Sequence, residues 1–325
     1  MSESVRSIGV LTSGGDAPGM NAAVRAVVRT AIKNNMRVFG IRQGYKGLLD
    51  RDMVELNLTN VSDIIQCGGT FLYTARCLAF KQEDSLQKAV DICKKSGIGG
   101  LVVIGGDGSF RGARDLSIRG IPCIGIPGTI DNDIYSSDYT IGFDTTLNTV
   151  IEMADRLRDT CESHNRCSVI EVMGNRSGNI ALYAGIACGA TAILVPERPF
   201  DLDKDIIEKI NFALKMGKQH FLVLKAEGVD YDSFELAKYI QSKTGVETRA
   251  TVLGHVQRGG RPTVRDRVVA SCMGYHAVQL LKQGIGNRVV VVRDDKIIDL
   301  DILEALNMTK PFDYELMTIA ETLAL

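Results

Sequence analysis

The chain has 325 residues, is 45% hydrophobic and 24% charged, and carries 38 Lys and Arg against 39 Asp and Glu. This composition is typical of a folded globular protein and excludes a disordered, collagenous or coiled-coil chain. The net charge of -1 excludes the broad basic surface of a non-specific nucleic-acid binder, and no apolar run approaches the roughly 18 residues of a membrane span.

Short apolar, β-branched segments alternate along the chain with longer segments of helical periodicity. Strands that are apolar throughout, alternating with helices, predict parallel sheets covered on both faces. We therefore expect an α/β fold with two doubly wound, mostly parallel-sheet three-layer domains. In chain order the predicted elements are strand 7–12, helix 21–33, strand 37–41, helix 85–95, strand 101–105, strand 123–127, helix 145–161, strand 168–172, strand 192–195, helix 203–216, strand 221–226, helix 233–243, strand 248–253, helix 263–282 and strand 288–292.

The 8 cysteines form no C-x-x-C pair and no metal-binding spacing. They are typical of small core residues in a reducing compartment. The segment 1–7 lacks the hydrophobic stretch of a signal peptide. These features predict a cytoplasmic protein.

Glycine accounts for 33 of the 325 residues, above the roughly 7% of average proteins. Three glycine-rich segments directly follow predicted strands, at 14–19 (GGDAPG), 105–109 (GGDGS) and 127–129 (PGT). Ligands bind doubly wound sheets at these strand ends, where backbone N–H groups and helix N-termini attract anions. One such loop is typical of a tight turn, but three in one sheet predict a phosphate site.

The spacing of the glycines excludes the best-known phosphate motifs. Gly14 and Gly19 match the first part of a Walker A motif, but Met20 and Asn21 replace its Lys and Ser/Thr, which excludes a P-loop NTPase. The glycines of 106–112 are spaced one residue longer than a dinucleotide fingerprint. A dehydrogenase therefore remains only a distant alternative.

Carboxylates accompany two of the three loops. Asp107 lies between glycines after a strand, a place that suits Mg²⁺ beside a phosphate. The segment 129–133 (TIDND) carries Asp131 and Asp133, of which one could accept a proton from an attacking hydroxyl and the other orient water or metal. Alone, this segment would indicate only an Asx turn, and its spacing excludes an EF-hand.

Cationic side chains that could bind phosphate are also present. The segment 255–260 (HVQRGG) places His255 and Arg258 in a glycine-rich loop after a strand, which suits a polyol and its phosphate. Arg76, Arg166 and Arg249 are further candidates, although most arginines on protein surfaces are merely solvated. His255 could equally be an ordinary buried residue.

Six motifs occur in a specific order: 11–21 (LTSGGDAPGMN), 68–70 (GGT), 104–109 (IGGDGS), 127–133 (PGTIDND), 171–174 (EVMG) and 254–260 (GHVQRGG). Over essentially the whole chain they resemble the bacterial ATP-dependent 6-phosphofructokinases (phosphofructokinase family A). The resemblance implies a glycolytic kinase that transfers the γ-phosphoryl group of MgATP to the 1-hydroxyl of fructose 6-phosphate. It also implies an allosteric homotetramer with the active site in the cleft between two domains.

The same resemblance divides the chain into two discontinuous domains. Residues 1–142 and about 256–308 would form an ATP-binding domain. Residues 143–255 and about 309–325 would form a sugar-phosphate-binding domain.

The resemblance further implies roles for single residues. Asp131 would be the base for the 1-hydroxyl, Thr129 would position that end of the sugar, and Arg76 would supply the positive charge of the missing Walker lysine. The ATP-binding residues would be Gly14, Arg76, Cys77, Gly106, Asp107, Gly108 and Ser109, with Asp107 holding Mg²⁺. The substrate-binding residues would be Thr129, Asp131, Arg166, Met173, Gly174, Asn175, Glu227, Arg249, His255 and Arg258, with Arg166 and Arg249 reaching in from a neighbouring subunit.

Two glycines favour ATP as the phosphoryl donor. Pyrophosphate-using relatives typically carry Asp where this chain has Gly108 and Lys where it has Gly128, and glycine at both positions leaves room for a nucleotide. A pyrophosphate-dependent enzyme is the runner-up. A further alternative is a catalytically idle regulatory paralogue that binds sugar phosphate or nucleotide. Its support is position 175, where the family often has Arg and this chain has Asn175, followed by Arg176.

The family's effector site for ADP or phosphoenolpyruvate is only partly matched. Arg25 and Arg29 share one helix face, and Arg158 and Lys218 also match. Four positions depart from the pattern: Leu58, Thr191, Met216 and Gln219. Because lost charges weaken a phosphate pocket, we expect weak or altered effector control.

Overall fold

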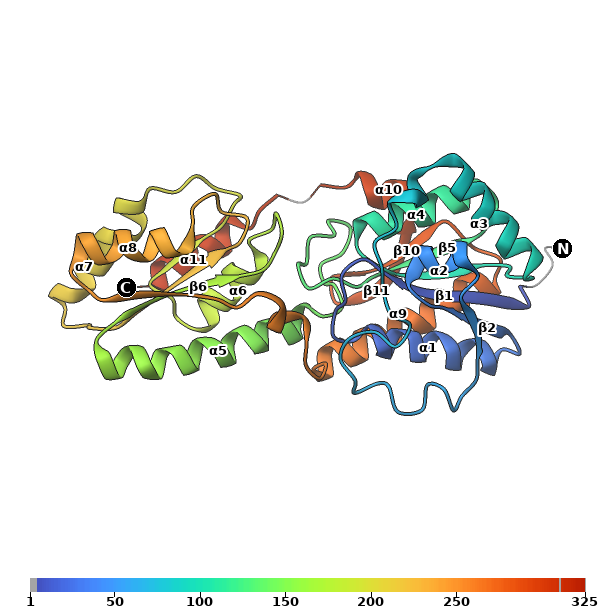
Figure 1. Cartoon of the computed structure of the whole chain (residues 1–325), viewed down its shortest axis with the longest axis horizontal. Coiled ribbons are helices and arrows are strands. Elements are labelled where there is room, and N and C mark those ends of the chain that lie inside the picture. Colours follow the sequence, from blue (N-terminus) through green and yellow to red (C-terminus); the bar gives the residue numbers. More distant parts are fainter. Residues whose placement is uncertain (1–4, 310, 325) are drawn as a thin grey trace. The chain divides into compact units, whose positions relative to one another are not determined.

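The computed structural model describes residues 5–309 and 311–324, which form two compact units (Figure 1). Of these residues, the first unit contains 5–130, 134–145 and 258–309, and the second contains 131–133, 146–257 and 311–324. Which unit holds which substrate stays a prediction.

The first unit is built on a seven-stranded sheet whose five inner strands are parallel. The central strands are buried along their whole length, which explains their continuous apolar sequences. In spatial order the strands are β11 (Lys296–Asp301), β10 (Arg288–Arg293), β5 (Cys123–Pro127), β4 (Leu101–Gly105), β1 (Ser7–Ser13), β2 (Arg37–Ile41) and β3 (Met53–Leu56).

The two edge strands, β3 and β11, are antiparallel and were not predicted. Both mix apolar with charged residues and are partly exposed, so neither reads as a buried strand. β11 pairs with β10 through a hairpin whose two turn residues, Asp294 and Asp295, both have positive φ. That is the geometry of the two-residue turns that fit the twist of a hairpin.

The order of the strands reverses beside β1. The chain passes from β1 to β2 and β3 on one side, and then returns to β4 on the other side of β1. In open α/β sheets this reversal is where ligands bind, at the carboxyl ends of the strands. The loops after β1 and β4 flank it.

Helices cover both faces of this sheet (Figure 1). Two of them pack together on one face, and the others lie with their apolar residues in a core on the opposite face, which contains Phe110, Leu116 and Val289. The paired helices are α1 (Met20–Lys33) and α9 (Val264–Lys282), and the others are α2 (Gly44–Asp50), α3 (Glu83–Lys95), α4 (Asp107–Ile118) and α10 (Ile302–Asn307).

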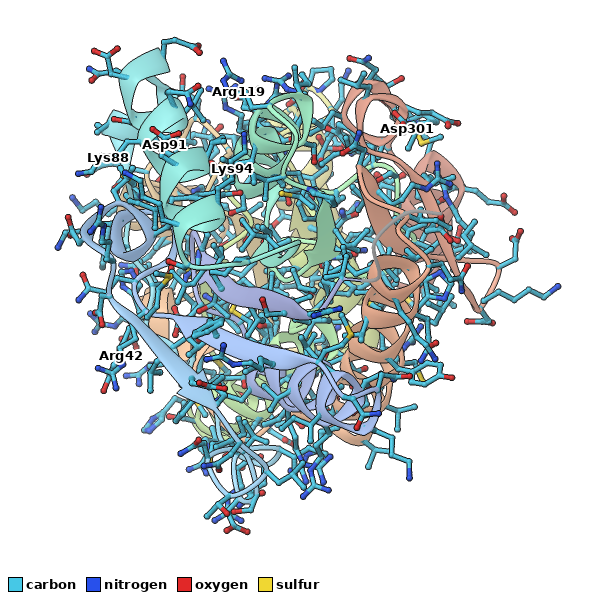
Figure 2. All side chains as sticks on the ribbon, turned by 90° about the vertical axis from the view of Figure 1, so that its right-hand side faces the viewer. Arg42, Lys88, Asp91, Lys94, Arg119 and Asp301 are labelled. Carbon is cyan, nitrogen blue, oxygen red and sulfur yellow. The ribbon has the colours of Figure 1, made fainter. Side chains whose placement is uncertain are left out.

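Charged side chains of both signs share the surface of this unit. Lys88, Asp91 and Lys94 project from α3 in Figure 2, with Arg119 nearby at the end of α4. Mixed charges of this kind agree with the near-zero net charge.

The second unit has a four-stranded, fully parallel sheet. The helix α8 packs on β6 and β9, and α6 packs on β7 and β8. The predicted helix 203–216 is a π-helical turn (Asp203–Ile207) followed by α7. In spatial order the strands are β7 (Ala192–Leu194), β8 (Phe221–Ala226), β6 (Cys167–Val172) and β9 (Thr248–Val252). The helices are α5 (Phe143–His164), α6 (Asn179–Ala187), α7 (Glu208–Lys215), α8 (Ser233–Thr244) and α11 (Tyr314–Leu323), of which α5 begins in the first unit and continues in the second from residue 146.

The two sheets and their covering helices confirm the predicted α/β class. Five of the eight cysteines are buried, as expected of core residues, and burial raises the pKa of the Cys93 thiol to about 12. Within the described part of the chain, no helix combines the length and apolar character needed to cross a membrane.

Candidate active site

The three glycine-rich loops of the first unit meet at one edge of its sheet. They follow β1, β4 and β5, which are neighbours and run parallel. The Ser109 hydroxyl donates to the Ser13 carbonyl at 3.1 Å, and the Gly128 N–H donates to the Gly105 carbonyl at 3.0 Å. A Cβ atom on Gly105 would lie 2.3 Å from the Ser13 carbonyl oxygen, so this close approach requires glycine.

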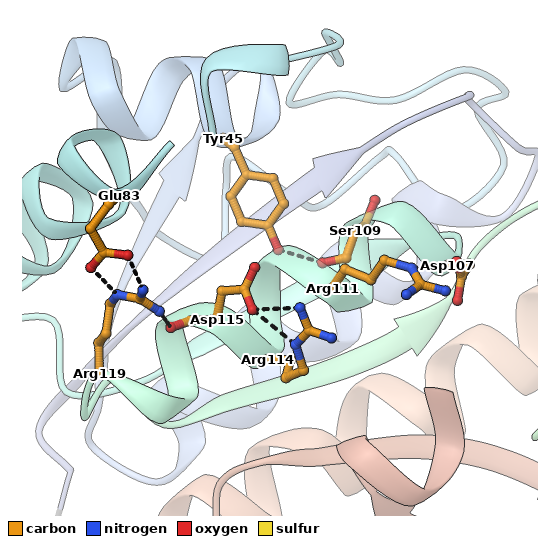
Figure 3. Close-up of polar contacts among 8 residues, drawn as sticks. All are labelled: Tyr45, Glu83, Asp107, Ser109, Arg111, Arg114, Asp115 and Arg119. Atoms are coloured by element: carbon orange, nitrogen blue, oxygen red, sulfur yellow. Dashed lines mark hydrogen bonds and ion pairs between the residues drawn. The ribbon is translucent and has the colours of Figure 1, made fainter. Parts of the chain in front are cut away.

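The second loop opens the helix α4, and its carboxylate lies at the helix N-terminus (Figure 3). Asp107 is the first residue of α4, is about half exposed, and pairs with Arg111 one turn later at 2.9 Å. The Tyr45 hydroxyl donates to the Ser109 carbonyl at 2.5 Å, and its ring stacks on Phe80. The first turn of α4 is thus held by Tyr45 on its buried side, while the Asp107 carboxylate faces solvent.

Asn21 anchors the loop that carries Arg76. Its side-chain amide donates to the carbonyls of Cys67 and Gly68 at 3.1 and 3.2 Å, and its oxygen accepts from the Phe71 N–H at 2.6 Å. The residue that breaks the Walker pattern therefore has a structural role in this loop, which the motif comparison did not show.

Threonines join the same loop to the first glycine loop. The Thr74 hydroxyl donates to the Gly14 carbonyl at 2.7 Å, and the Thr12 hydroxyl donates to the Tyr73 carbonyl at 2.8 Å. Arg76 is exposed and Cys77 partly exposed, only two and three residues beyond Thr74. The structure thus brings Gly14 and the segment of Arg76 and Cys77 together.

The structure also places Arg258 at the first glycine loop. Arg258 ends a 3₁₀ turn, Gly254–Arg258, and its guanidinium donates to the Asp16 carbonyl at 3.1 Å. His255 lies three residues earlier in this turn and is exposed, which excludes the ordinary buried histidine.

The loop after β5 carries Thr129 and Asp131, whose side chains are almost completely shielded from solvent. Thr129 is 9% exposed and Asp131 is 8% exposed. The Thr140 hydroxyl donates to the Thr129 carbonyl at 2.7 Å, and the Ile141 N–H donates to the Pro127 carbonyl at 3.0 Å. Residues 140 and 141, which follow this loop in the chain, therefore hydrogen-bond to its first residues, 127–129.

In the second unit, Glu227 and the segment after β6 come together. One oxygen of Glu227 accepts the N–H groups of Gly174 and Asn175, at 3.2 and 2.7 Å. Gln257 is fully buried and accepts the Met173 N–H at 3.2 Å. The importance of Gln257 was not predicted, although it lies within the 254–260 motif.

Asn175 has a left-handed backbone conformation, with φ of 56°. Asparagine is one of the residues that tolerate this conformation. Asn175 is exposed, as is the following Arg176. Asn175 is thus compatible with its local backbone, and its N–H contributes to the Glu227 contact.

Arg166 and Arg249 share one carboxylate, that of Glu247. Arg166 Nε lies 2.8 Å from one oxygen of Glu247, and an Arg249 guanidinium nitrogen lies 2.7 Å from the other. The pKa of Glu247 is lowered, most by the hydrogen bond from Arg166 and next by the hydrogen bond from Arg249. The two predicted phosphate-binding arginines therefore form one cationic pair.

This arginine pair lies at the opposite end of the second sheet from Glu227. Arg166 precedes β6 and Arg249 is the second residue of β9, whereas Glu227 and residues 173–175 follow the carboxyl ends of β8 and β6. Six residues of β6 separate the two ends, which is a span of about 20 Å. Within one chain, the arginine pair and Glu227 do not meet.

The matched effector residues lie in two separate pairs. Arg25 and Arg29 lie one turn apart on α1, and burial together with the charge of Arg29 lowers the pKa of Arg25. In the second unit, the pKa of Lys218 is lowered mainly by burial and also by the positive charge of Arg158. These two cations are therefore also close to each other. Among the departures, Thr191 is buried, whereas Leu58, Met216 and Gln219 are exposed.

The donor set of the first unit is compatible with magnesium that arrives with a nucleotide. Within residues 5–309 and 311–324, no three or more His, Cys, Asp or Glu side chains form a group that could hold a metal ion. Magnesium at nucleotide sites is commonly held by one or two carboxylates together with substrate phosphates. The exposed carboxylate of Asp107 fits that arrangement.

Comparison with known proteins identifies related sequences. The family model for phosphofructokinase matches residues 7–281. An ATP-dependent 6-phosphofructokinase from Clostridium botulinum (strain Hall) is 56% identical over 320 residues, which cover 98% of this chain and all of that protein. The corresponding protein of Alkaliphilus metalliredigens is 52% identical, covering 99% of this chain and all of its own length.

Solved structures share the fold. The phosphofructokinase of Saccharomyces cerevisiae aligns with a TM-score of 0.87 and 33% identity over 98% of this chain, which spans 48% of the yeast chain. A pyrophosphate-dependent phosphofructokinase from Marinobacter aquaeolei aligns with a TM-score of 0.86 over 96% of this chain and 86% of its own. At 23% identity, the second likeness concerns the fold alone.

Proposed function

The chain belongs to the phosphofructokinase family, and we propose that it is an ATP-dependent 6-phosphofructokinase. It transfers the γ-phosphoryl group of ATP to the 1-hydroxyl of fructose 6-phosphate, giving fructose 1,6-bisphosphate and ADP. The observation that carries this proposal is the match along almost the whole chain to ATP-dependent enzymes, at 56% identity. The meeting of three glycine-rich loops at one sheet edge supports it.

In this function the first unit binds ATP. The phosphates lie against the N–H groups of the glycine loops and the N-terminus of α4, where the helix dipole favours negative charge. Arg76, tethered beside the first loop through Thr74, neutralises charge that develops on the transferred group. The remaining ATP contacts are Gly14, Cys77, Gly106, Gly108 and Ser109.

Asp107 would hold the Mg²⁺ that accompanies ATP, and the ion supplies further charge neutralisation on the phosphate oxygens when bound. Arg111 pairs with the Asp107 carboxylate from one turn later on α4, and the carboxylate is still about half exposed. An aspartate at this position also suits the positive end of the helix dipole.

Asp131 acts as the general base. Its carboxylate takes the proton of the 1-hydroxyl while the hydroxyl oxygen bonds to the γ-phosphorus and the bond to the ADP oxygen breaks. Thr129 orients the hydroxyl. The shielding of Asp131 from solvent suits this role, because water would compete for the reacting groups.

The sugar phosphate binds to residues of the 173–175 segment together with Glu227, His255 and Arg258. Two N–H groups hold the Glu227 carboxylate in place, so that it can accept hydrogen bonds from sugar hydroxyls. The cations bind the 6-phosphate.

Gly108 and Gly128 bear on the donor in different ways. A Cβ on Gly108 would meet nothing within 4 Å, so an aspartate there would project freely beside Asp107 and repel the nucleotide's phosphates. A Cβ on Gly128 would lie 3.1 Å from both Ile104 and Met20, so packing alone disfavours lysine there. Gly108 is therefore the more direct determinant of ATP use.

We also propose a homotetramer in the cytoplasm. Arg166 and Arg249 lie about 20 Å from the Glu227 end of their own sheet, which supports their binding the 6-phosphate of a neighbouring subunit. Effector control by ADP or phosphoenolpyruvate would be weak or altered, because Thr191 is uncharged and buried and Leu58, Met216 and Gln219 lack the family's charges.

The purified full chain should form fructose 1,6-bisphosphate from fructose 6-phosphate with ATP, and little or none with pyrophosphate. Asp131→Ala should lower kcat by about 10²- to 10⁴-fold, while fructose 6-phosphate still binds. Turnover with pyrophosphate instead would support the runner-up, and binding without any turnover would support the idle paralogue. Normal ADP activation and phosphoenolpyruvate inhibition at micromolar levels would contradict altered effector control.

A further inference from the structure

A fully buried carboxylate that has no place in the proposed chemistry lies near the N-terminus of α9. Asp266 is 0% exposed and accepts four hydrogen bonds. One of its oxygens accepts the Tyr139 hydroxyl at 2.5 Å and the Gly142 N–H at 2.7 Å. The other accepts the N–H of Thr145 at 2.9 Å and also the Thr145 hydroxyl.

These contacts hold several groups of the chain around one carboxylate. Burial raises the pKa of Asp266 above its ordinary value, although the four hydrogen bonds act in the opposite direction. A carboxyl group whose pKa is raised on folding destabilises the folded state when the pH is above that pKa. What the ionised group supplies is geometry, because it fixes four donors from three residues around one point.

The segment held by Asp266 supports the loop of the proposed base. Residues 139–145 include Thr140, whose hydroxyl donates to the Thr129 carbonyl, and Ile141, whose N–H donates to the Pro127 carbonyl. Ile141 also forms a β-bridge with Gly128. Residues 127–129, the exit of β5, are therefore held by a segment that Asp266 itself holds.

The N-terminal turn of α9 strengthens this link. The Thr263 N–H donates to the Thr145 hydroxyl at 3.0 Å, and the Thr263 hydroxyl accepts the Asp266 N–H at 3.3 Å. The Arg265 guanidinium lies 4.5 Å from the centre of the Tyr139 ring. All these residues belong to the first unit.

We propose that Asp266 is a positioning residue for phosphoryl transfer. Through residues 139–145 it fixes the backbone of residues 127–129, which carries Thr129 and leads directly into Asp131. This inference rests on the proposed function, since it assigns Asp131 the role of base. A displacement of a reacting group by about 1 Å can cost on the order of 10²-fold in rate, and the loss of this support is expected to act in that way.

The test compares Asp266→Asn with the wild-type chain. The amide keeps one acceptor oxygen but turns an N–H₂ group toward two of the four donors, so the 139–145 segment must shift. We expect kcat per folded enzyme to fall by about 10²-fold. The KM for ATP should change less than about threefold, because the loops after β1 and β4 keep their own hydrogen bonds.

A matched control is Asp299→Asn, in the same unit. Asp299 also receives side-chain hydrogen bonds, from His276 at 2.8 Å and Arg288 at 2.7 Å, on the β11 side of the sheet. This variant should keep kcat within about twofold of the wild type. Thermal melting of both variants gives the folded fraction by which kcat is normalised.

The inference is overturned when Asp266→Asn melts at a lower temperature but has an unchanged kcat per folded enzyme, since that is a purely structural role. Should Asp266→Asn not fold, Tyr139→Phe decides, because it removes one of the four donors. A kcat lowered at unchanged KM for ATP supports positioning, and unchanged values of both overturn it. A wild-type chain that forms no fructose 1,6-bisphosphate from ATP overturns the proposed function itself, and this inference with it.

Discussion

The two units assemble their predicted sites in different ways. In the first unit, hydrogen bonds to backbone carbonyls join the loops: the Ser109 hydroxyl donates to Ser13, and the Gly128 N–H donates to Gly105. In the second unit, carboxylates do so, with Glu227 accepting two N–H groups and Glu247 binding two arginines. Where backbone packs against backbone, as at Gly105, there is no room for an added atom. The contacts of the second unit depend instead on the charge of the carboxylates.

Gly105→Ala tests the first half of this comparison and should have the largest effect. The new Cβ would lie 2.3 Å from the Ser13 carbonyl oxygen, so β1 and β4 must separate at their carboxyl ends. We expect a destabilisation of about 1–3 kcal/mol and a loss of about 10²-fold in kcat/KM for ATP. Chemical denaturation and steady-state kinetics measure the two effects, and an unchanged stability together with an unchanged kcat/KM for ATP would contradict this prediction.

Asn21→Ala sharpens the comparison, because here the side chain of one uncharged residue holds a whole loop of the first unit. Three hydrogen bonds to the 67–71 segment are lost, which costs about 1–3 kcal/mol in stability. We expect the KM for ATP to rise about tenfold, because the loop that carries Arg76 loses its anchor at residues 67–71. An unchanged KM for ATP would show that the threonine contacts suffice to hold this loop.

Glu227→Gln tests the second half. The amide oxygen can still accept the N–H groups of Gly174 and Asn175, but the negative charge is gone. Because hydrogen bonds to a charged acceptor are stronger by about 1 kcal/mol, the KM for fructose 6-phosphate should rise about fivefold. Isothermal titration with the sugar phosphate and with ATP would check this, and a weakened affinity for ATP alone would contradict it.

Glu247→Gln should have the smallest effect, and its effect should depend on pH. Arg166 and Arg249 lower the pKa of Glu247 in the folded protein. The stability from this ion pair is therefore present above the unfolded-state pKa of about 4.3 and is lost as pH falls through the lower folded-state value. The melting temperatures of wild type and variant should differ at pH 7 and converge toward pH 3, and a constant difference would be the contrary result.

Much of the fold could be predicted from local patterns. The apolar runs of β2, β4, β5 and β8 give these strands with their observed bounds. The edge strands β3 and β11 were missed, because a half-exposed strand carries no continuous apolar run. The predicted helix 145–161 is shorter at both ends than α5 (Phe143–His164), because polar terminal turns weaken the helical periodicity.

The sequence by itself determined the α/β class, the phosphate-binding character of three loops, and the resemblance to one kinase family. These properties reside in short segments, where periodicity and glycine act on neighbouring residues. Tertiary structure decided the rest. Arg258 reaches Asp16 across 242 positions of the chain, and Asp266 holds Tyr139 across 127. Such contacts arise only when the packed sheet brings distant segments within hydrogen-bond distance, and no local pattern encodes them.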